Sequence, residues 1–256
     1  MENFLDKILA EKRREVDRMV METPRPVRQT KGFVQRLRED EAYLQVIGEV
    51  KRASPSLGVI NMTVDVLSQA KSYETAGVSA ISVLTDPVFF KGSIDDLRLV
   101  ADNVSIPVLN KDFIIDKKQI VRAVNSGATI VLLIVACLSE SDLKKLYQFA
   151  VSLGLEVLVE VHNAPELEVA HRIGAELIGV NNRNLKTFEV SLQNSLDLVS
   201  LQQADRFYIS ESGIKSHLEA EQVAADFRAV LVGEALMKDG NPTDAAKQLQ
   251  VKRHVD

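Results

Sequence analysis

Acidic and basic side chains stand together where an apolar run of this chain ends, and such groups can bind anions and move protons. The run that begins at Val46 reaches Glu49 and Lys51 and then a serine–proline turn. Side chains two residues apart on a β-strand share a face, so Glu49 and Lys51 point the same way. Charges on the inner face of a sheet are costly unless they are paired or used, so we expect a site around them.

Five later apolar runs also end in polar clusters. The clusters are Asn110-Lys111-Asp112, Glu160-Val161-His162, Asn181-Asn182-Arg183, Ser210-Glu211-Ser212-Gly213 and Gly233-Glu234. Alternation along the strands allows five side chains to face a common axis, namely Lys51, Lys111, Glu160, Asn181 and Glu211. Lysines, an arginine and glutamates around one opening suit an anionic substrate and proton transfer.

Glycines mark the joints between the elements that must carry these clusters. Four helical segments end at Gly77, Gly127, Gly154 and Gly174, and a β-rich run follows each at once. Glycine just past a helix, followed by a short connection to a buried strand, is typical of a helix-to-strand joint. Helix start signals stand between the strands, for example Ser93 with an acid three residues on.

Eight strands are expected, and together they predict an α/β fold. Their starts lie near Gln45, Ser79, Ile106, Thr129, Leu155, Glu176, Arg206 and Ala229. The strands are almost continuous apolar runs, as in a parallel sheet that is covered on both faces. The pattern predicts a single (β/α)8 TIM barrel over residues 1–256, with an open doubly wound sheet as the alternative. The active site of such a barrel lies at the C-terminal ends of its strands, where the polar clusters stand.

Residues 1–44 precede the first strand and are expected to form an N-terminal helical extension of the same domain. Apolar residues recur at helical spacing within residues 1–22, and Pro24 and Pro26 are expected to end that helix. A second helical stretch covers Lys31–Tyr43. The basic run Lys12-Arg13-Arg14 is interpreted as a solvated helix face.

Glycine also stands in two loops that could hold a phosphate. Ser212-Gly213 and Gly233-Glu234 follow the seventh and eighth expected strands. Glycine there lets backbone N–H groups approach a phosphate, and a following helix N-terminus adds positive potential. Each motif alone is a weak signal, but their position in the last two units of a barrel favours a phosphate site.

Bulk composition excludes several classes of function. The net charge of -5 and the pI near 5.5 argue against a general binder of nucleic acid or of anionic membranes. The single cysteine, Cys137, excludes an intrachain disulfide and a cysteine-rich metal site. No apolar run reaches about 18 residues and the acidic start is unlike a signal peptide, so a cytoplasmic enzyme or binding protein is expected.

Together the polar clusters resemble the motif series of the indole-3-glycerol phosphate synthase family. The matching motifs are Glu49-x-Lys51-x-x-Ser54-Pro55-Ser56, Asn110-Lys111-Asp112-Phe113, Glu160-Val161-His162, Asn181-Asn182-Arg183-Asn184-Leu185 and Ser210-Glu211-Ser212-Gly213-Ile214. They follow the family's order, one per expected strand end, across residues 45–240, and the helical extension resembles the family too. Gly48 stands where alanine is more frequent, and Lys91 stands where a polar amide is frequent.

The resemblance implies a carboxy-lyase of tryptophan biosynthesis. Such an enzyme closes the indole ring of 1-(2-carboxyphenylamino)-1-deoxyribulose 5-phosphate with loss of CO2 and water. Lys111 is then the general acid, which a lysine can be if burial and neighbours tune its pKa toward the working pH. Glu160 is the base of the final dehydration, Lys51 holds the substrate carboxylate, and Glu49 positions the lysines. Which lysine donates which proton stays open.

The resemblance also implies the residues that bind substrate. They are Ser54, Phe90, Phe113, Asn181, Arg183, Glu211, Ser212, Gly213, Gly233 and Glu234, the last chiefly through its backbone N–H. The implied partner is a small phosphorylated substrate, without nucleic acid or membrane. No metal ion or organic cofactor is implied, and association with other enzymes of the pathway is left open.

Simpler interpretations stay open beside these roles. Glu49 and Lys51 could be a structural ion pair, Glu160 and Arg183 could be ordinary loop charges, and the two aromatic residues could be packing. His162 is interpreted as a structural or supporting residue. For the whole chain, the alternatives are a sugar-phosphate isomerase and a non-catalytic barrel that binds a phosphorylated ligand. Two lysines and a glutamate favour the lyase, because isomerisation typically needs one acid and one base.

Overall fold

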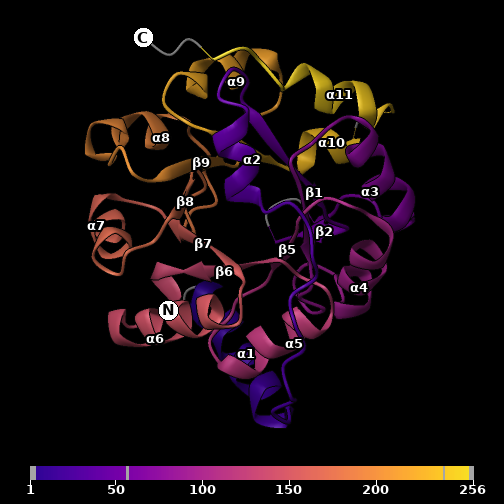
Figure 1. The fold of residues 1–256 in the computed structure, drawn as a ribbon, viewed down its shortest axis with the longest axis vertical. Helices are drawn as coiled ribbons and strands as arrows, with labels where there is room; N and C mark the ends of the chain where they lie inside the picture. Colours follow the sequence, from indigo (N-terminus) through magenta and orange to yellow (C-terminus); the bar gives the residue numbers. More distant parts are fainter. Residues whose placement is uncertain (1–3, 56–57, 239, 254–256) are drawn as a thin grey trace.

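Eight parallel strands close into a barrel in this computed structural model, which describes residues 4–55, 58–238 and 240–253 (Figure 1). In barrel order the strands are β1 (Gln45–Val50), β4 (Ala80–Leu84), β5 (Val108–Lys111), β6 (Ile130–Ile134), β7 (Glu156–Val161), β8 (Leu177–Asn181), β9 (Phe207–Glu211) and β10 (Ala229–Val232). A small antiparallel pair follows β1, formed by β2 (Ala53–Ser54) and β3 (Gly58–Val59). Each barrel strand starts within two residues of its expected position, so the TIM barrel is confirmed and the open sheet is excluded.

Helices cover the outside of the barrel. They are α3 (Val66–Thr75), α4 (Ile94–Asn103), α5 (Lys117–Asn125), α6 (Glu140–Ser152), α7 (Ala164–Arg172), α8 (Gln193–Asp197), α9 (His217–Ala224), α10 (Glu234–Lys238) and α11 (Pro242–Gln248), with the 3-10 helices η1 (Val135–Cys137) and η2 (Val199–Leu201). Ser93 accepts the N–H of the residue three positions on, as its sequence context predicts. The four glycines at the predicted joints all have positive φ. No helix in the described ranges has the length and apolar character that crossing a membrane requires.

One helix of the N-terminal extension plugs an end of the barrel. Phe33 and Leu37 of α2 (Phe33–Glu39) pack within the apolar layer that fills the barrel interior. Glu156, the first residue of β7, accepts the main-chain N–H groups of Phe33 and Val34, both at 2.8 Å. Because β7 begins there, α2 closes the N-terminal ends of the strands.

The other helix of the extension, α1 (Phe4–Arg18), lies at the opposite end. Phe4 and Ile8 line a cavity at the C-terminal ends of the strands. The C-terminal part of α1 lies beside α5 (Figure 1), where Glu15 pairs with Arg122 at 2.6 Å. The extension therefore contacts both ends of the barrel.

A connecting segment, residues 19–32, joins these two helices along the outside of the barrel. Arg28 donates a hydrogen bond to the main-chain oxygen of Ile106 at 2.6 Å. Both expected helices are too long, since α1 ends at Arg18 rather than near residue 22, and α2 ends at Glu39 rather than at residue 43. For α1 the physical reason is that the connecting segment bonds to the barrel instead of to itself. For α2 it is that residues 42–44 pair with residues 251–253 instead of continuing the helix. Residues 1–3 of the first expected helix lie outside the described residues, as does Ser56 of the first motif.

The basic run of α1 is only partly solvated. Arg13 and Arg14 are exposed as expected, but the side chain of Lys12 is only 1% exposed. Its ammonium pairs with Asp86 at 2.9 Å and with Asp112 at 2.7 Å. The interpretation of the run as a solvated face is therefore wrong at Lys12, because this position faces the barrel.

The end of the extension, residues 42–44, pairs with residues 251–253 beside α2. Leu44 donates its N–H to the main-chain oxygen of Val251 at 2.8 Å, and Arg253 donates its N–H to that of Ala42 at 2.8 Å. The guanidinium of Arg253 adds a hydrogen bond to the main-chain oxygen of Glu41 at 3.1 Å. The extension is therefore held by the last residues of the chain as well as by the barrel.

Candidate active site

A cavity of about 340 Å³ opens at the C-terminal ends of the strands. All fourteen site residues predicted from the sequence line it, namely Glu49, Lys51, Ser54, Phe90, Lys111, Phe113, Glu160, Asn181, Arg183, Glu211, Ser212, Gly213, Gly233 and Glu234. Clusters that are far apart in the sequence therefore meet in one place, as barrel geometry requires. Within the described ranges, no group of three His, Cys, Asp or Glu side chains is arranged to hold a metal ion.

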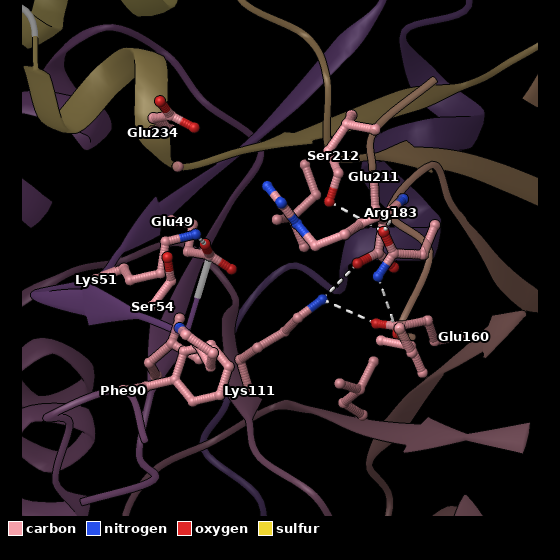
Figure 2. A pocket seen from close by; sticks show the side chains of 18 of the residues that line it. Glu49, Lys51, Ser54, Phe90, Lys111, Glu160, Arg183, Glu211, Ser212 and Glu234 are labelled. Atoms are coloured by element: carbon pink, nitrogen blue, oxygen red, sulfur yellow. Dashed lines mark hydrogen bonds and ion pairs between the residues drawn. The ribbon is translucent and has the colours of Figure 1, made fainter. Parts of the chain in front are cut away.

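The ammonium of Lys111 stands between two carboxylates (Figure 2). Its Nζ lies 3.2 Å from Glu160 Oε2 and also pairs with Glu211 Oε2. Asn181 donates to Glu160 Oε1 at 3.0 Å and accepts the hydroxyl of Ser212 at 2.9 Å. Four different strands, β5, β7, β8 and β9, thus supply the charged and amide members of one hydrogen-bonded network.

The charges of this network move each other's pKa values. Burial raises the pKa of Glu211 to about 7, with Lys111 opposing the shift and Glu160 adding to it. For Glu160, burial is outweighed by Lys111 and His162, which hold its pKa well below the usual range. For Lys111, burial is outweighed by Glu211, Glu160 and Glu49, which raise its pKa. The neighbours of Lys111 therefore act opposite to the tuning expected for it, and the group poised near neutral pH is Glu211.

A second ion pair, between Glu49 and Lys51, lies across the cavity from Glu160 (Figure 2). Lys51 Nζ is 2.5 Å from Glu49 Oε1, and Tyr73 donates its hydroxyl to the main-chain oxygen of Glu49 at 3.2 Å. A Cβ on Gly233 would lie 2.5 Å from Glu49 Oε1, so glycine at that strand end makes room for the carboxylate. A Cβ on Gly48 would lie 2.7 Å from the ring of Tyr73, which explains glycine in place of the family's usual alanine.

The loop after β9 brings main chain to the cavity in a strained conformation. Ser212 and Gly213 have φ values of 67° and 88°, and a non-glycine residue persists in this region only when its surroundings hold it. Asn182 stabilises this conformation of Ser212, because its Nδ2 donates to the main-chain oxygen of Ser212 at 3.0 Å and to Ser210 Oγ at 2.9 Å. Such a loop lets main-chain N–H groups approach an anion.

Arg183 and Glu234 stand at the rim. Arg183 Nη1 donates to the main-chain oxygen of Phe188 at 3.2 Å and forms no ion pair with the described carboxylates, so its charge is available to an anion. Glu234 pairs with Lys238 of its own helix at 2.7 Å, and this hydrogen bond lowers the pKa of Glu234. Because its side chain is engaged by Lys238, a role of Glu234 in binding a ligand stays a prediction for its backbone N–H.

An apolar wall completes the cavity. The rings of Phe90 and Phe113 lie with centroids 6.0 Å apart. Helix α1 adds Phe4, Leu5 and Ile8, which were not selected as site residues from the sequence. Their helical spacing indicates an apolar face, but no local signal says that this face covers the mouth of a barrel.

His162 bridges Glu160 and a further carboxylate, Glu166. Its Nε2 lies 3.2 Å from Glu160 Oε1, and its Nδ1 lies 3.0 Å from Glu166 Oε2. Burial lowers its affinity for a proton, but the two carboxylates outweigh burial and raise the pKa of His162 to about 10. A positively charged ring beside Glu160 fits the supporting role expected for this histidine.

Gly179 of β8 also shapes the site, and it was not among the site residues predicted from the sequence. A Cβ there would lie 2.0 Å from Glu211 Oε1, so the missing side chain makes room for this carboxylate inside the barrel. The available signal is glycine inside an apolar strand, which often marks a close approach of another group.

Solved structures of similar fold include two enzymes at low sequence identity. The 3-hexulose-6-phosphate synthase of Salmonella typhimurium aligns with a TM-score of 0.67 at 13% identity, over 80% of this chain and 96% of that chain. Thiamine phosphate pyrophosphorylase of Pyrococcus furiosus aligns with a TM-score of 0.60 at 14% identity, over 80% and 93%. At these identities the likeness supports the barrel fold alone.

Sequence comparison is more specific. A family model described as indole-3-glycerol phosphate synthase matches residues 5–249. The protein of that name from Lactococcus lactis subsp. lactis is 60% identical over 252 residues, which cover 98% of this chain and 96% of that protein. The one from Streptococcus pneumoniae is 56% identical over 252 residues, which cover 98% and 99%. The chain therefore belongs to the indole-3-glycerol phosphate synthase family.

Proposed function

We propose that this chain closes the indole ring of 1-(2-carboxyphenylamino)-1-deoxyribulose 5-phosphate in tryptophan biosynthesis. The reaction loses CO2 and water and yields indole-3-glycerol phosphate, which makes the protein a carboxy-lyase. The observation that carries the proposal is a lysine between two buried glutamates, Lys111 with Glu160 and Glu211, in a cavity that also holds Lys51. This set supplies the acid, the base and the positive charge that the reaction needs.

The cavity suits the substrate, which carries an aromatic carboxylate at one end and a phosphate at the other. The phosphate is assigned to the main chain of Ser212, Gly213 and Gly233, where side chains do not block an approach. The aromatic ring is assigned to the wall formed by Phe90 and Phe113. The rings and the loops are both at the strand ends, so the substrate spans the cavity.

Carbon–carbon bond formation comes first. The ring carbon that bears the carboxylate attacks the ketone carbon, and Lys111 donates its proton to the ketone oxygen, which becomes a hydroxyl. Lys51 holds the substrate carboxylate until CO2 leaves, and the electron pair of the broken bond restores the aromatic ring. The raised pKa keeps Lys111 protonated at neutral pH, so the proton is present, but the same shift makes Lys111 a weaker acid than a lysine tuned toward neutral pH.

Dehydration follows. The new hydroxyl accepts a proton from a lysine and leaves as water, and Glu160 accepts the proton released as the second double bond of the indole forms. The lowered pKa keeps Glu160 ionised at neutral pH, so it can accept a proton, but the same shift makes it a weaker base than an ordinary glutamate. Lys51 can donate this proton directly, and Lys111 can donate it only after it has regained the proton that it gave to the ketone oxygen.

The test is to measure indole-3-glycerol phosphate formation by its fluorescence. Lys111→Ala and Glu160→Ala should each lower kcat by about 10²- to 10⁴-fold while leaving the circular dichroism spectrum unchanged. Lys145→Ala is the matched control, because Lys145 is exposed on α6 and pairs only with Asp142 among the described residues. A folded wild-type protein that forms no product contradicts the function, and near-normal turnover of either variant contradicts the role of that residue.

A further inference from the structure

The buried ammonium of Lys12, on α1, touches the strand end that carries Lys111. Asp112 Oδ1 lies 2.7 Å from Lys12 Nζ and belongs to the residue directly after Lys111. The other oxygen of Asp112 accepts the hydroxyl of Thr85 at 2.7 Å, and Oδ1 also accepts the N–H of Phe113 at 2.8 Å. This carboxylate is thus held between α1, the end of β4 and the loop after β5.

The same ammonium holds the loop after β4. Asp86 Oδ2 lies 2.9 Å from Lys12 Nζ, and Asp86 Oδ1 accepts the main-chain N–H groups of Phe89 and Phe90 at 2.6 and 3.3 Å. Phe90 lines the cavity. The ring of Phe4 packs edge-on against Phe89 with centroids 5.4 Å apart, so α1 contacts this loop at two points about two helical turns apart.

Charge balance explains why a lysine is buried at this place. Burial alone lowers the pKa of Lys12, but Asp112 and Asp86 outweigh it and raise the pKa, so the side chain stays charged. Arg122 Nη2 is a second cation near Asp112, at 3.7 Å. Among the described residues, Lys12 is the cation that pairs with Asp86. The charge of Asp86 is therefore balanced by Lys12.

We propose that Lys12 is a positioning residue for the ring-closing reaction. Through Asp112 it fixes the strand end that carries Lys111, and through Asp86 it fixes the loop that carries Phe90. The inference rests on the function proposed above and adds to it that a charge on the N-terminal helix sets the geometry of the proton donor and of the wall for the aromatic ring. Helix α1 then positions residues of the site in addition to lining the cavity.

Lys12→Met tests this inference, because methionine keeps much of the length of the side chain and removes its charge. Arg13→Met is the matched control on the same helix, since Arg13 is exposed. The expected result is a fall of kcat/KM by about 10²-fold for Lys12→Met, with both a lower kcat and a higher KM, because small misplacements of reacting groups have effects of this size. Arg13→Met should match the wild type. Kinetics are measured well below the melting temperature of each protein, where a purely structural role leaves both constants unchanged.

A double variant keeps the test decisive if Lys12→Met does not fold. Lys12→Met/Asp86→Asn removes the unbalanced charge together with the lysine, and asparagine retains an oxygen for the N–H of Phe89. This protein should fold and still show the reduced kcat/KM, because the link from α1 to Asp112 is absent.

The outcomes separate the two proposals. Near-wild-type kcat and KM in a folded single or double variant overturn the role of Lys12, even if the melting temperature falls. A folded wild-type protein that forms no product overturns the enzymatic function, and with it the inference about Lys12. An active wild type with impaired Lys12 variants and a normal Arg13→Met supports both.

Discussion

Replacing His162 with glutamine should remove a pH-dependent part of the stability of this protein. Burial alone lowers the pKa of the His162 ring, but Glu160 and Glu166 outweigh burial and raise this pKa to about 10. The difference from about 6.5 in the unfolded chain, at about 1.36 kcal/mol per pH unit, corresponds to a ceiling of about 5 kcal/mol. Solvent screening at Glu166, whose side chain is 20% exposed, brings the realised value below this ceiling. Glutamine keeps a donor near Glu160 and carries no titrating ring.

The sign of the effect follows from the raised pKa. The stabilisation is fully present below about pH 6.5 and is lost as the pH rises through about 10. The free energy of unfolding of the wild type should therefore fall more steeply with pH in this window than that of His162→Gln. Urea unfolding followed by circular dichroism at about pH 6, 8 and 9.5 measures the difference.

A matched control is His217→Gln. His217 also pairs with a glutamate four residues on, but its side chain is 54% exposed, so its removal should leave the slope almost unchanged. Parallel stability curves for the wild type and His162→Gln would refute the reasoning.

Two further predictions concern Glu211. Gly179→Ala places a Cβ 2.0 Å from Glu211 Oε1, so the carboxylate must move away from Lys111. The kcat should then fall about tenfold or more while the circular dichroism spectrum stays unchanged. An unchanged kcat would show that the space beside Gly179 is not needed. Glu211→Gln removes a carboxyl whose raised pKa makes stability fall as the pH rises from about 4.5 to about 7. That variant should melt higher than the wild type at about pH 8 while losing turnover, and a lower melting temperature there would count against the raised pKa.

Features set by local chemistry could be predicted from the sequence. Gly154 has a φ of 87°, a conformation that other residues resist, so the helix-to-strand joint is marked in the sequence itself. Asn163 accepts the N–H of Glu166 at 3.0 Å and starts α7 as its residue type suggests. The alternation of side chains is equally local, which is why the inward positions of Glu160 and Glu211 followed from their places on the strands.

Features set by docking could not be predicted in this way. The local sequence of Lys12-Arg13-Arg14 does not indicate whether one of these side chains is buried. The burial of Lys12 depends on Asp86 and Asp112, which lie far away in the chain. The ends of α1 and α2 likewise depend on what the residues that follow each helix contact in the folded chain. The raised pKa of Lys111 depends on the convergence of carboxylates from three other strands, which motif order alone does not measure.

The contacts between the extension and the C-terminal residues impose an order on biosynthesis. Leu44 and Ala42 bond to Val251 and Arg253, so residues that leave the ribosome early find these partners only after nearly the whole chain has been made. Contacts between such distant segments form late in folding as well, because the long loop between them must close first. Until then the apolar side chains of Phe33 and Leu37, which end up inside the barrel, remain uncovered, and such transiently exposed apolar surface favours aggregation.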